Sequence, residues 1–180
     1  MNRGELLTRI TIWIATGGYA VSVAVSLFQG RLPFRERRRW QARARWAWTL
    51  GCLGLVAHTV CAFHFYHHWS QASAYRETAR QTAEVTGMNW GGGLFINYAF
   101  LAAWIGDVAW WWRGLDAYRR RSWLITAIWQ GIFIFMLFNA TVVFKTGVVR
   151  ALGFGLFLAL ALFWWLSLRG RGALDPEGMN

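Results

Sequence analysis

The sequence predicts an all-α integral membrane protein, a bundle of five transmembrane helices with the N-terminus outside and the C-terminus in the cytoplasm. Hydrophobic residues make up 56% of the 180 residues, whereas charged residues make up 15%. Five long apolar segments are present, and a spanning helix needs about 20 mostly apolar residues. The connections between them are short and polar or basic, so we expect residues 1–180 to form one transmembrane domain.

Each predicted span is an apolar stretch that ends at a polar or arginine-rich connection. The spans cover about residues 10–29, 47–67, 93–112, 123–144 and 151–168. Most of the 14 tryptophans fall near a predicted span end. An indole favours that boundary, because its ring packs among apolar groups while its N–H donates to water. The tryptophans are therefore interpreted as interfacial belts.

A further helix is expected outside the membrane, at about residues 70–87. The segment is rich in Ala, Gln, Glu and Arg, most of which are good helix formers. Arg80 and Glu84 stand one helical turn apart, where opposite charges attract. Gly87 is the expected end, because glycine readily adopts the left-handed conformation that closes a helix. The segment is only weakly apolar, so we expect it either to lie over the outer mouth of the bundle or to be a plain connector.

The arginines predict the orientation of the chain. Seven arginines lie between Arg31 and Arg45, and four lie between Arg113 and Arg121. Cytoplasmic connections carry an excess of Lys and Arg. These two connections and the C-terminal tail are therefore predicted to be cytoplasmic, which places thirteen of the 19 basic residues inside. Arginine outnumbers lysine by 18 to 1, which favours a GC-rich bacterial genome and hence a bacterial cytoplasmic (inner) membrane.

The net charge and the first span each allow a second interpretation. The net charge of +11 is typical of many nucleic-acid-binding proteins, but no soluble domain carries a basic face here, so no nucleic-acid partner is predicted. The first span could instead be a signal peptide processed near Ala24-Val25-Ser26. Cleavage there would leave the arginine-rich connection outside, against the charge rule. A retained first span is therefore favoured.

All four histidines lie in one short stretch, at His58, His64, His67 and His68. If the second span is helical throughout, His64 and His68 share one face, and that spacing can present two imidazoles to one metal. A copper or zinc site completed by a side chain of the outer segment is therefore an alternative. The favoured interpretation is a polar helix end, and no cofactor is predicted.

Counting depth along the spans predicts two polar layers. His64, Asn97 and Asn139 fall at a similar depth near the outer side, and Asp107 and Gln130 form an inner pair. A carboxylate inside a span costs on the order of 3 kcal/mol by insertion scales, so Asp107 is expected to face the bundle and accept hydrogen bonds.

The expected donors to Asp107 are Gln130 or an indole, with Trp110 and Trp111 the nearest in sequence. A bond of this kind would join the third and fourth spans. The alternative role for Asp107 is a proton or cation step in a small transporter.

Small residues recur at four-residue spacing in the first and fifth spans. The two ridges are Gly18, Ser22 and Ser26, and Ala151, Gly155 and Ala159. Such ridges let helices approach closely in lipid. Packing within the bundle is the favoured interpretation, and contact with a second subunit is the alternative.

No nucleotide-binding loop, nucleophile–base set or haem ligation from two helices is visible in the sequence. The sequence therefore favours a non-enzymatic accessory, assembly or structural subunit of a membrane complex. The expected partners are the lipid bilayer and other membrane subunits or further copies of the chain. The alternatives are an outward-facing metal- or redox-site protein using His64 and His68, and a small transporter using Asp107.

Overall fold

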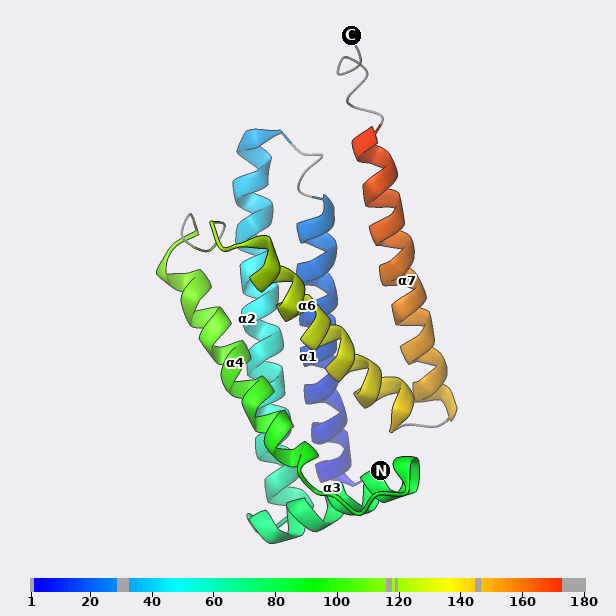
Figure 1. Cartoon of the computed structure of the whole chain (residues 1–180). Helices are drawn as coiled ribbons and strands as arrows, with labels where there is room; N and C mark the ends of the chain where they lie inside the picture. Colours follow the sequence, from blue (N-terminus) through cyan, green and yellow to red (C-terminus); the bar gives the residue numbers. More distant parts are fainter. Residues whose placement is uncertain (1, 29–32, 116–117, 119, 145–146, 173–180) are drawn as a thin grey trace.

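The computed structural model is all-helical over the residues that it describes. These are residues 2–28, 33–115, 118, 120–144 and 147–172, without the side chains of 34–35, 163–164 and 166–172. The elements are α1 (Arg3–Phe28), α2 (Phe34–Phe65), α3 (Gln71–Thr86), α4 (Gly93–Arg113), α6 (Trp123–Phe138), a π-helical turn η2 (Asn139–Val143) and α7 (Gly147–Gly172). In Figure 1, α1, α2, α4 and α7 run roughly along the length of the molecule, and α6 crosses over α1 and α2 at an angle.

Four helical segments are long and apolar enough to cross a membrane. They are Arg3–Phe28, Glu36–Phe65, Gly93–Arg113 and Trp123–Val143. The apolar part of α7, Gly147–Leu162, is shorter. The third and fourth predicted spans agree closely with these segments, and the chain has the features of a membrane protein.

The arginine-rich connection after the first span is largely helical, which corrects the predicted boundary of the second span. Helix α2 begins at Phe34 and continues for 32 residues to Phe65, whereas the predicted span covers residues 47–67. Arginine, glutamine and alanine are strong helix formers, so the helix extends well beyond its apolar part. Pro33 lies at the N-cap, where its missing N–H removes no helical bond.

The helices α1 and α2 pack backbone against backbone. A Cβ atom on Gly18 would lie 2.5 Å from the carbonyl oxygen of Ala47 and 2.6 Å from the Cα atom of Gly51. A Cβ atom on Gly54 would lie 2.8 Å from the backbone nitrogen of Ala15. Glycines on both helices therefore permit this close approach, and the ridge of the first span serves packing within the chain at Gly18.

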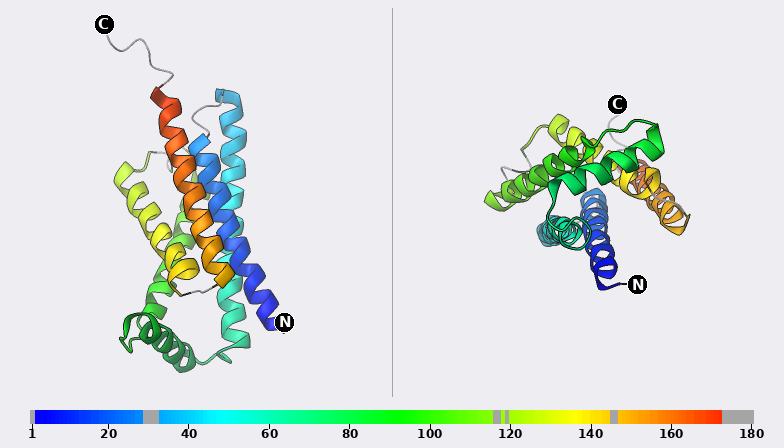
Figure 2. Two further views of the ribbon diagram at one scale, coloured as in Figure 1. Left: turned by 90° about the vertical axis from the view of Figure 1, so that its right-hand side faces the viewer. Right: turned by 90° about the horizontal axis from the view of Figure 1, so that it is seen from below.

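The amphipathic helix α3 lies across one end of the bundle (Figures 1 and 2). Its N-cap Ser70 accepts a hydrogen bond from Ser73 N at 3.2 Å, and it ends at Gly87, whose φ is 78°. Arg80 pairs with Glu84, as the sequence predicts, and also with Glu77. Tyr98 on α4 donates to Gln71 Oε1 at 2.8 Å, which ties α3 to the bundle. We call this end of the molecule the α3 end.

The opposite end, called the arginine end, contains the start of α2 and the connection from α4 to α6 (Figure 1). Between the two ends lies an aromatic layer, made of Tyr19, Trp48, Trp104 and Phe133. Phe133 is its centre, with ring centroids 4.7 Å from Trp48, 4.6 Å from Trp104 and 5.0 Å from Tyr19. All four side chains are buried. The layer therefore joins α1, α2, α4 and α6 in one core.

Candidate functional site

The buried carboxylate of Asp107 is the centre of the strongest polar site. Its Oδ2 accepts hydrogen bonds from Trp48 Nε1 at 2.9 Å and from the Tyr118 hydroxyl at 2.8 Å. Its Oδ1 pairs with Arg121 Nη1 at 2.9 Å, and the Asp107 and Arg121 side chains are only 2% and 10% exposed. We call these four residues the Asp107 centre. It connects α2, α4 and the segment before α6.

The donors to Asp107 differ from those nearest in sequence. An indole does donate, but it is that of Trp48 on α2 rather than Trp110 or Trp111. Gln130 instead accepts a hydrogen bond from the Tyr19 hydroxyl at 3.0 Å, so it joins α6 to α1. The predicted inner pair of Asp107 and Gln130 is therefore wrong as a direct contact. Asp107 bonds to Trp48, and Gln130 bonds to Tyr19.

Burial raises the pKa of Tyr118 above its ordinary value, and the negative charge of Asp107 raises it further. Its hydroxyl therefore stays protonated and remains a donor at any physiological pH. Stacking on Trp111, with ring centroids 4.5 Å apart, holds the Tyr118 ring in place. Sequence reasoning missed Tyr118 and Arg121, because they lie in a connection that was interpreted only as a charge marker. The available signal was a lone carboxylate in a span just before an arginine-rich connection.

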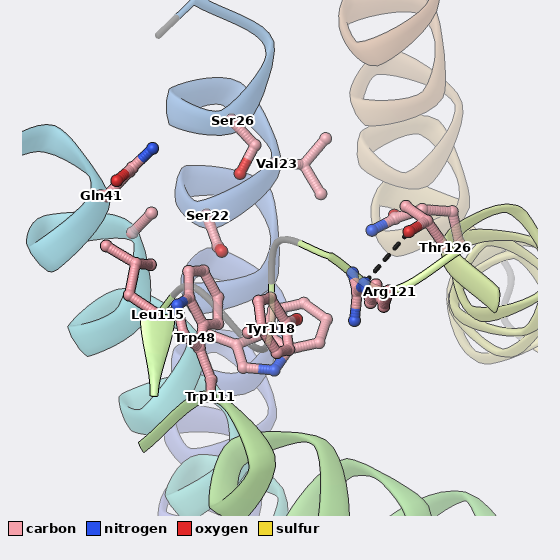
Figure 3. Close-up of a pocket in the computed structure, with 12 residues that line it drawn as sticks. Ser22, Val23, Ser26, Gln41, Trp48, Trp111, Leu115, Tyr118, Arg121 and Thr126 are labelled. Atoms are coloured by element: carbon pink, nitrogen blue, oxygen red, sulfur yellow. Dashed lines mark hydrogen bonds between the residues drawn. The ribbon is translucent and has the colours of Figure 1, made fainter. Parts of the chain in front are cut away.

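A cavity of about 240 Å³ lies beside the Asp107 centre, and we call it the arginine-end cavity. Its polar lining includes Ser22, Gln41, Arg121, Thr126 and Gln130. In Figure 3, Ser22 of α1 lies between Gln41 of α2 on one side and Arg121 and Thr126 on the other. Ser26, which is exposed, lies at its rim, so the cavity runs inward from the surface.

A second cavity, of about 340 Å³, lies on the other side of the aromatic layer, toward α3. Tyr19, Trp104 and Phe133 line its deep part. Its polar lining comes from α1, α2, α3, α4 and the turn after α2, and comprises Thr16, His58, Thr59, His67, Glu77, Thr78, Gln81 and Asn97 among others. Outside the membrane segments, hydrogen bonds from Arg80 and Gln81 lower the pKa of Glu77 to about 2. Glu77 is therefore a carboxylate throughout the physiological range.

The predicted helical face of His64 and His68 is not formed. Helix α2 ends at Phe65, and His68 lies in the following turn with a left-handed φ of 48°. The His64 ring instead packs against Phe65, with ring centroids 4.6 Å apart. The i, i+4 argument for a shared metal fails here because it requires an unbroken helix.

The other two histidines have contacts of their own. His58 Nδ1 lies 2.9 Å from the carbonyl oxygen of Thr8, which links α2 to α1. His67 Nδ1 lies 3.5 Å from the Ser73 hydroxyl. In the described part of the chain, no group of three or more His, Cys, Asp or Glu side chains is placed to hold a metal ion.

The outer layer predicted from depth is not joined by hydrogen bonds between its three members, as far as the described residues show. Asn97 lines the cavity at the α3 end. Asn139 Nδ2 donates to the carbonyl oxygen of Phe135 in its own helix, at 2.8 Å. His64 is exposed. Equal depth along the spans therefore did not imply contact.

We predict that the purified protein retains no stoichiometric copper, zinc or iron after dialysis. Without a shared helical face, His64 and His68 lack the fixed geometry that a tight site needs. Elemental analysis of dialysed protein provides the measurement, with the His64→Ala variant as control. A metal that survives dialysis in the parent chain and disappears in His64→Ala would establish the metal site instead.

Comparisons with protein-family models, curated proteins and solved structures find no match to this chain.

Proposed function

We propose that the chain is a five-span protein of a bacterial cytoplasmic membrane and a non-enzymatic accessory or structural subunit of a membrane complex. In this proposal α7 is the fifth span, the α3 end is outside and the arginine end is cytoplasmic. The supporting pattern is the concentration of arginines at one end, which is typical of cytoplasmic connections.

The proposed structural role rests on the Asp107 centre, where groups of this chain supply the hydrogen bonds to the buried carboxylate. Its carboxylate accepts from three donors, one on α2 and two in the segment between α4 and α6, and its negative charge is paired with Arg121. A carboxylate that shuttles protons or cations needs access to a changing partner, whereas this one is held in a fixed network. The network is suited to tying helices together.

The small-residue ridge of α7 supports contact with another membrane segment. Ala151, Gly155 and Ala159 are all exposed. A Cβ atom on Gly155 would meet no atom within 4 Å, whereas one on Gly18 would collide with α2. The ridge of α1 is therefore covered at Gly18 by α2 of the same chain. The ridge of α7 is left open to a neighbouring helix or to lipid.

We predict that Gly155→Leu reduces assembly without reducing the stability of the single chain. The added side chain points into open space within the chain but fills the ridge that a neighbouring helix would occupy. The measurement is the particle mass in a mild detergent, compared with 20.7 kDa for one chain. Gly131→Leu is a matched control on α6, because a Cβ atom there also meets nothing within 4 Å.

The parent protein and Gly131→Leu should form a larger particle, and Gly155→Leu should shift to the single chain. If the parent protein, extracted from native membranes under the same conditions, has the particle mass of a single chain, the subunit proposal is contradicted. If the particle mass of Gly155→Leu equals that of the parent protein, the ridge of α7 is not the contact between subunits.

A further inference from the structure

Two buried polar atoms in the arginine-end cavity lack a partner among the described residues. They are Gln41 Oε1 and Trp111 Nε1, and both residues line the cavity. Gln41 is 5% exposed and Trp111 is 7% exposed, so neither side chain lies open to bulk solvent. A buried polar group left unpaired is costly, which makes a bound partner in this cavity favourable.

The cavity combines an unused acceptor with several donors. Arg121 uses Nε for Thr126 and Nη1 for Asp107, and a guanidinium carries five N–H donors in all. Among the described residues no hydrogen bond uses its Nη2 group, so that group can donate to a ligand together with Trp111 Nε1. Ser22 and Ser26 add hydroxyl groups to the lining. Gln41 Oε1 supplies the acceptor.

The charge at this end favours an anion. Arg121 is the charged side chain among the described residues that line the cavity, and none of these lining residues carries a carboxylate. The described arginines toward this end are Arg37, Arg38, Arg39, Arg43, Arg45, Arg113, Arg120 and Arg121. Such a cluster raises the local concentration of anions near the rim.

We propose that the arginine-end cavity binds an anionic phosphate group that carries or adjoins a hydroxyl. Arg121 and Trp111 donate to the phosphate oxygens, and the ligand hydroxyl donates to Gln41 Oε1. Inorganic phosphate has this chemistry, because its monoanion keeps a P–OH group. The headgroup of phosphatidylglycerol has it as well, because its glycerol hydroxyls adjoin the phosphate. The volume of about 240 Å³ suits a group of this size and is small for a larger metabolite.

The proposal goes beyond the subunit role and does not depend on it. It predicts discrimination against sulfate, which has the same tetrahedral shape and the charge of the phosphate dianion but, unlike either phosphate ion at neutral pH, has no proton to donate to Gln41. It also predicts a specific dependence on the Trp111 indole N–H, which phenylalanine lacks while retaining a ring that stacks on Tyr118.

The test is equilibrium dialysis of the full chain, in lipid-free detergent, against radiolabelled inorganic phosphate. Native mass spectrometry of the chain released from phosphatidylglycerol or phosphatidylcholine nanodiscs forms the second arm. The variants are Trp111→Phe and Gln41→Glu, and Trp110→Phe is the matched control because Trp110 does not line the cavity. Circular dichroism confirms that each variant remains folded.

We expect one phosphate group per chain, unaffected by equal sulfate, and a roughly tenfold or greater loss of affinity in Trp111→Phe. Gln41→Glu should abolish binding by placing a carboxylate against the anion. Retention of inorganic phosphate identifies the free ion as the source, and selective retention of phosphatidylglycerol identifies the lipid. Absence of both, equal competition by sulfate, or unchanged binding in Trp111→Phe would overturn the proposal.

Discussion

Replacing Asp107 with alanine is expected to destabilise the folded chain by about 3–5 kcal/mol, the range measured when one partner of a buried ion pair is removed. The substitution leaves the Arg121 guanidinium buried without its counter-charge, and it leaves the Trp48 indole and the Tyr118 hydroxyl without their acceptor. The measurement is the unfolding transition in mixed micelles of increasing denaturing-detergent content, followed by circular dichroism.

Two controls separate this effect from a general sensitivity to losing a carboxylate. Glu84→Ala removes an ion pair with Arg80 in which both side chains are more than half exposed, so its cost should stay below about 1 kcal/mol. The double variant Asp107→Leu with Arg121→Met removes both charges and should recover much of the loss. An Asp107→Ala transition that coincides with that of Glu84→Ala would show that the Asp107 centre does not hold the bundle together.

Replacing Gly18 with leucine is expected to destabilise the α1–α2 pair by about 3 kcal/mol, the upper end of the usual cost of overpacking. The first added carbon alone would meet backbone atoms of Ala47 and Gly51 at 2.5 to 2.7 Å. Backbone atoms cannot rotate away as a side chain can, so the two helices must separate. The same micelle unfolding experiment measures the loss.

Gly17→Leu is the matched control, since it lies one residue away and a Cβ atom there meets nothing within 4 Å. Leucine also has a higher helix propensity than glycine, so Gly17→Leu should be neutral or slightly stabilising. A similar destabilisation in both variants would indicate a general effect of bulk on α1 rather than the close approach of α1 to α2.

The elements that the sequence predicted best are those whose ends carry their own chemical signal. Helix α4 starts at Gly93, the last residue of the glycine run, and stops at Arg113, one residue from the predicted boundary. Helix α3 is bounded by the Ser70 cap and the left-handed Gly87. Both boundaries depend on local backbone chemistry, which a sequence displays directly.

The features that the sequence could not supply depend on contacts between distant segments. Helix α2 begins at Phe34, well before the predicted span. The run of arginines indicates where a membrane ends, but it does not indicate where a helix begins. The donors to Asp107 come from positions 59 residues before it and up to 14 residues after it. The pairing of Tyr19 with Gln130 joins residues 111 apart. Depth along a span places residues at one level, but only packing decides which of them touch.

The orientation of a membrane-spanning bundle is the central claim, because the proposed subunit role assumes a chain that spans the membrane. Its direct test is labelling of single cysteines with a membrane-impermeant maleimide in intact cells, in a chain with Cys52→Ala and Cys61→Ala. Ala72→Cys on α3 and Glu36→Cys on α2 are both at exposed positions. We predict labelling of Ala72→Cys from outside and labelling of Glu36→Cys only after the membrane is permeabilised. The reverse pattern, or labelling of both positions in intact cells, would contradict the proposed topology.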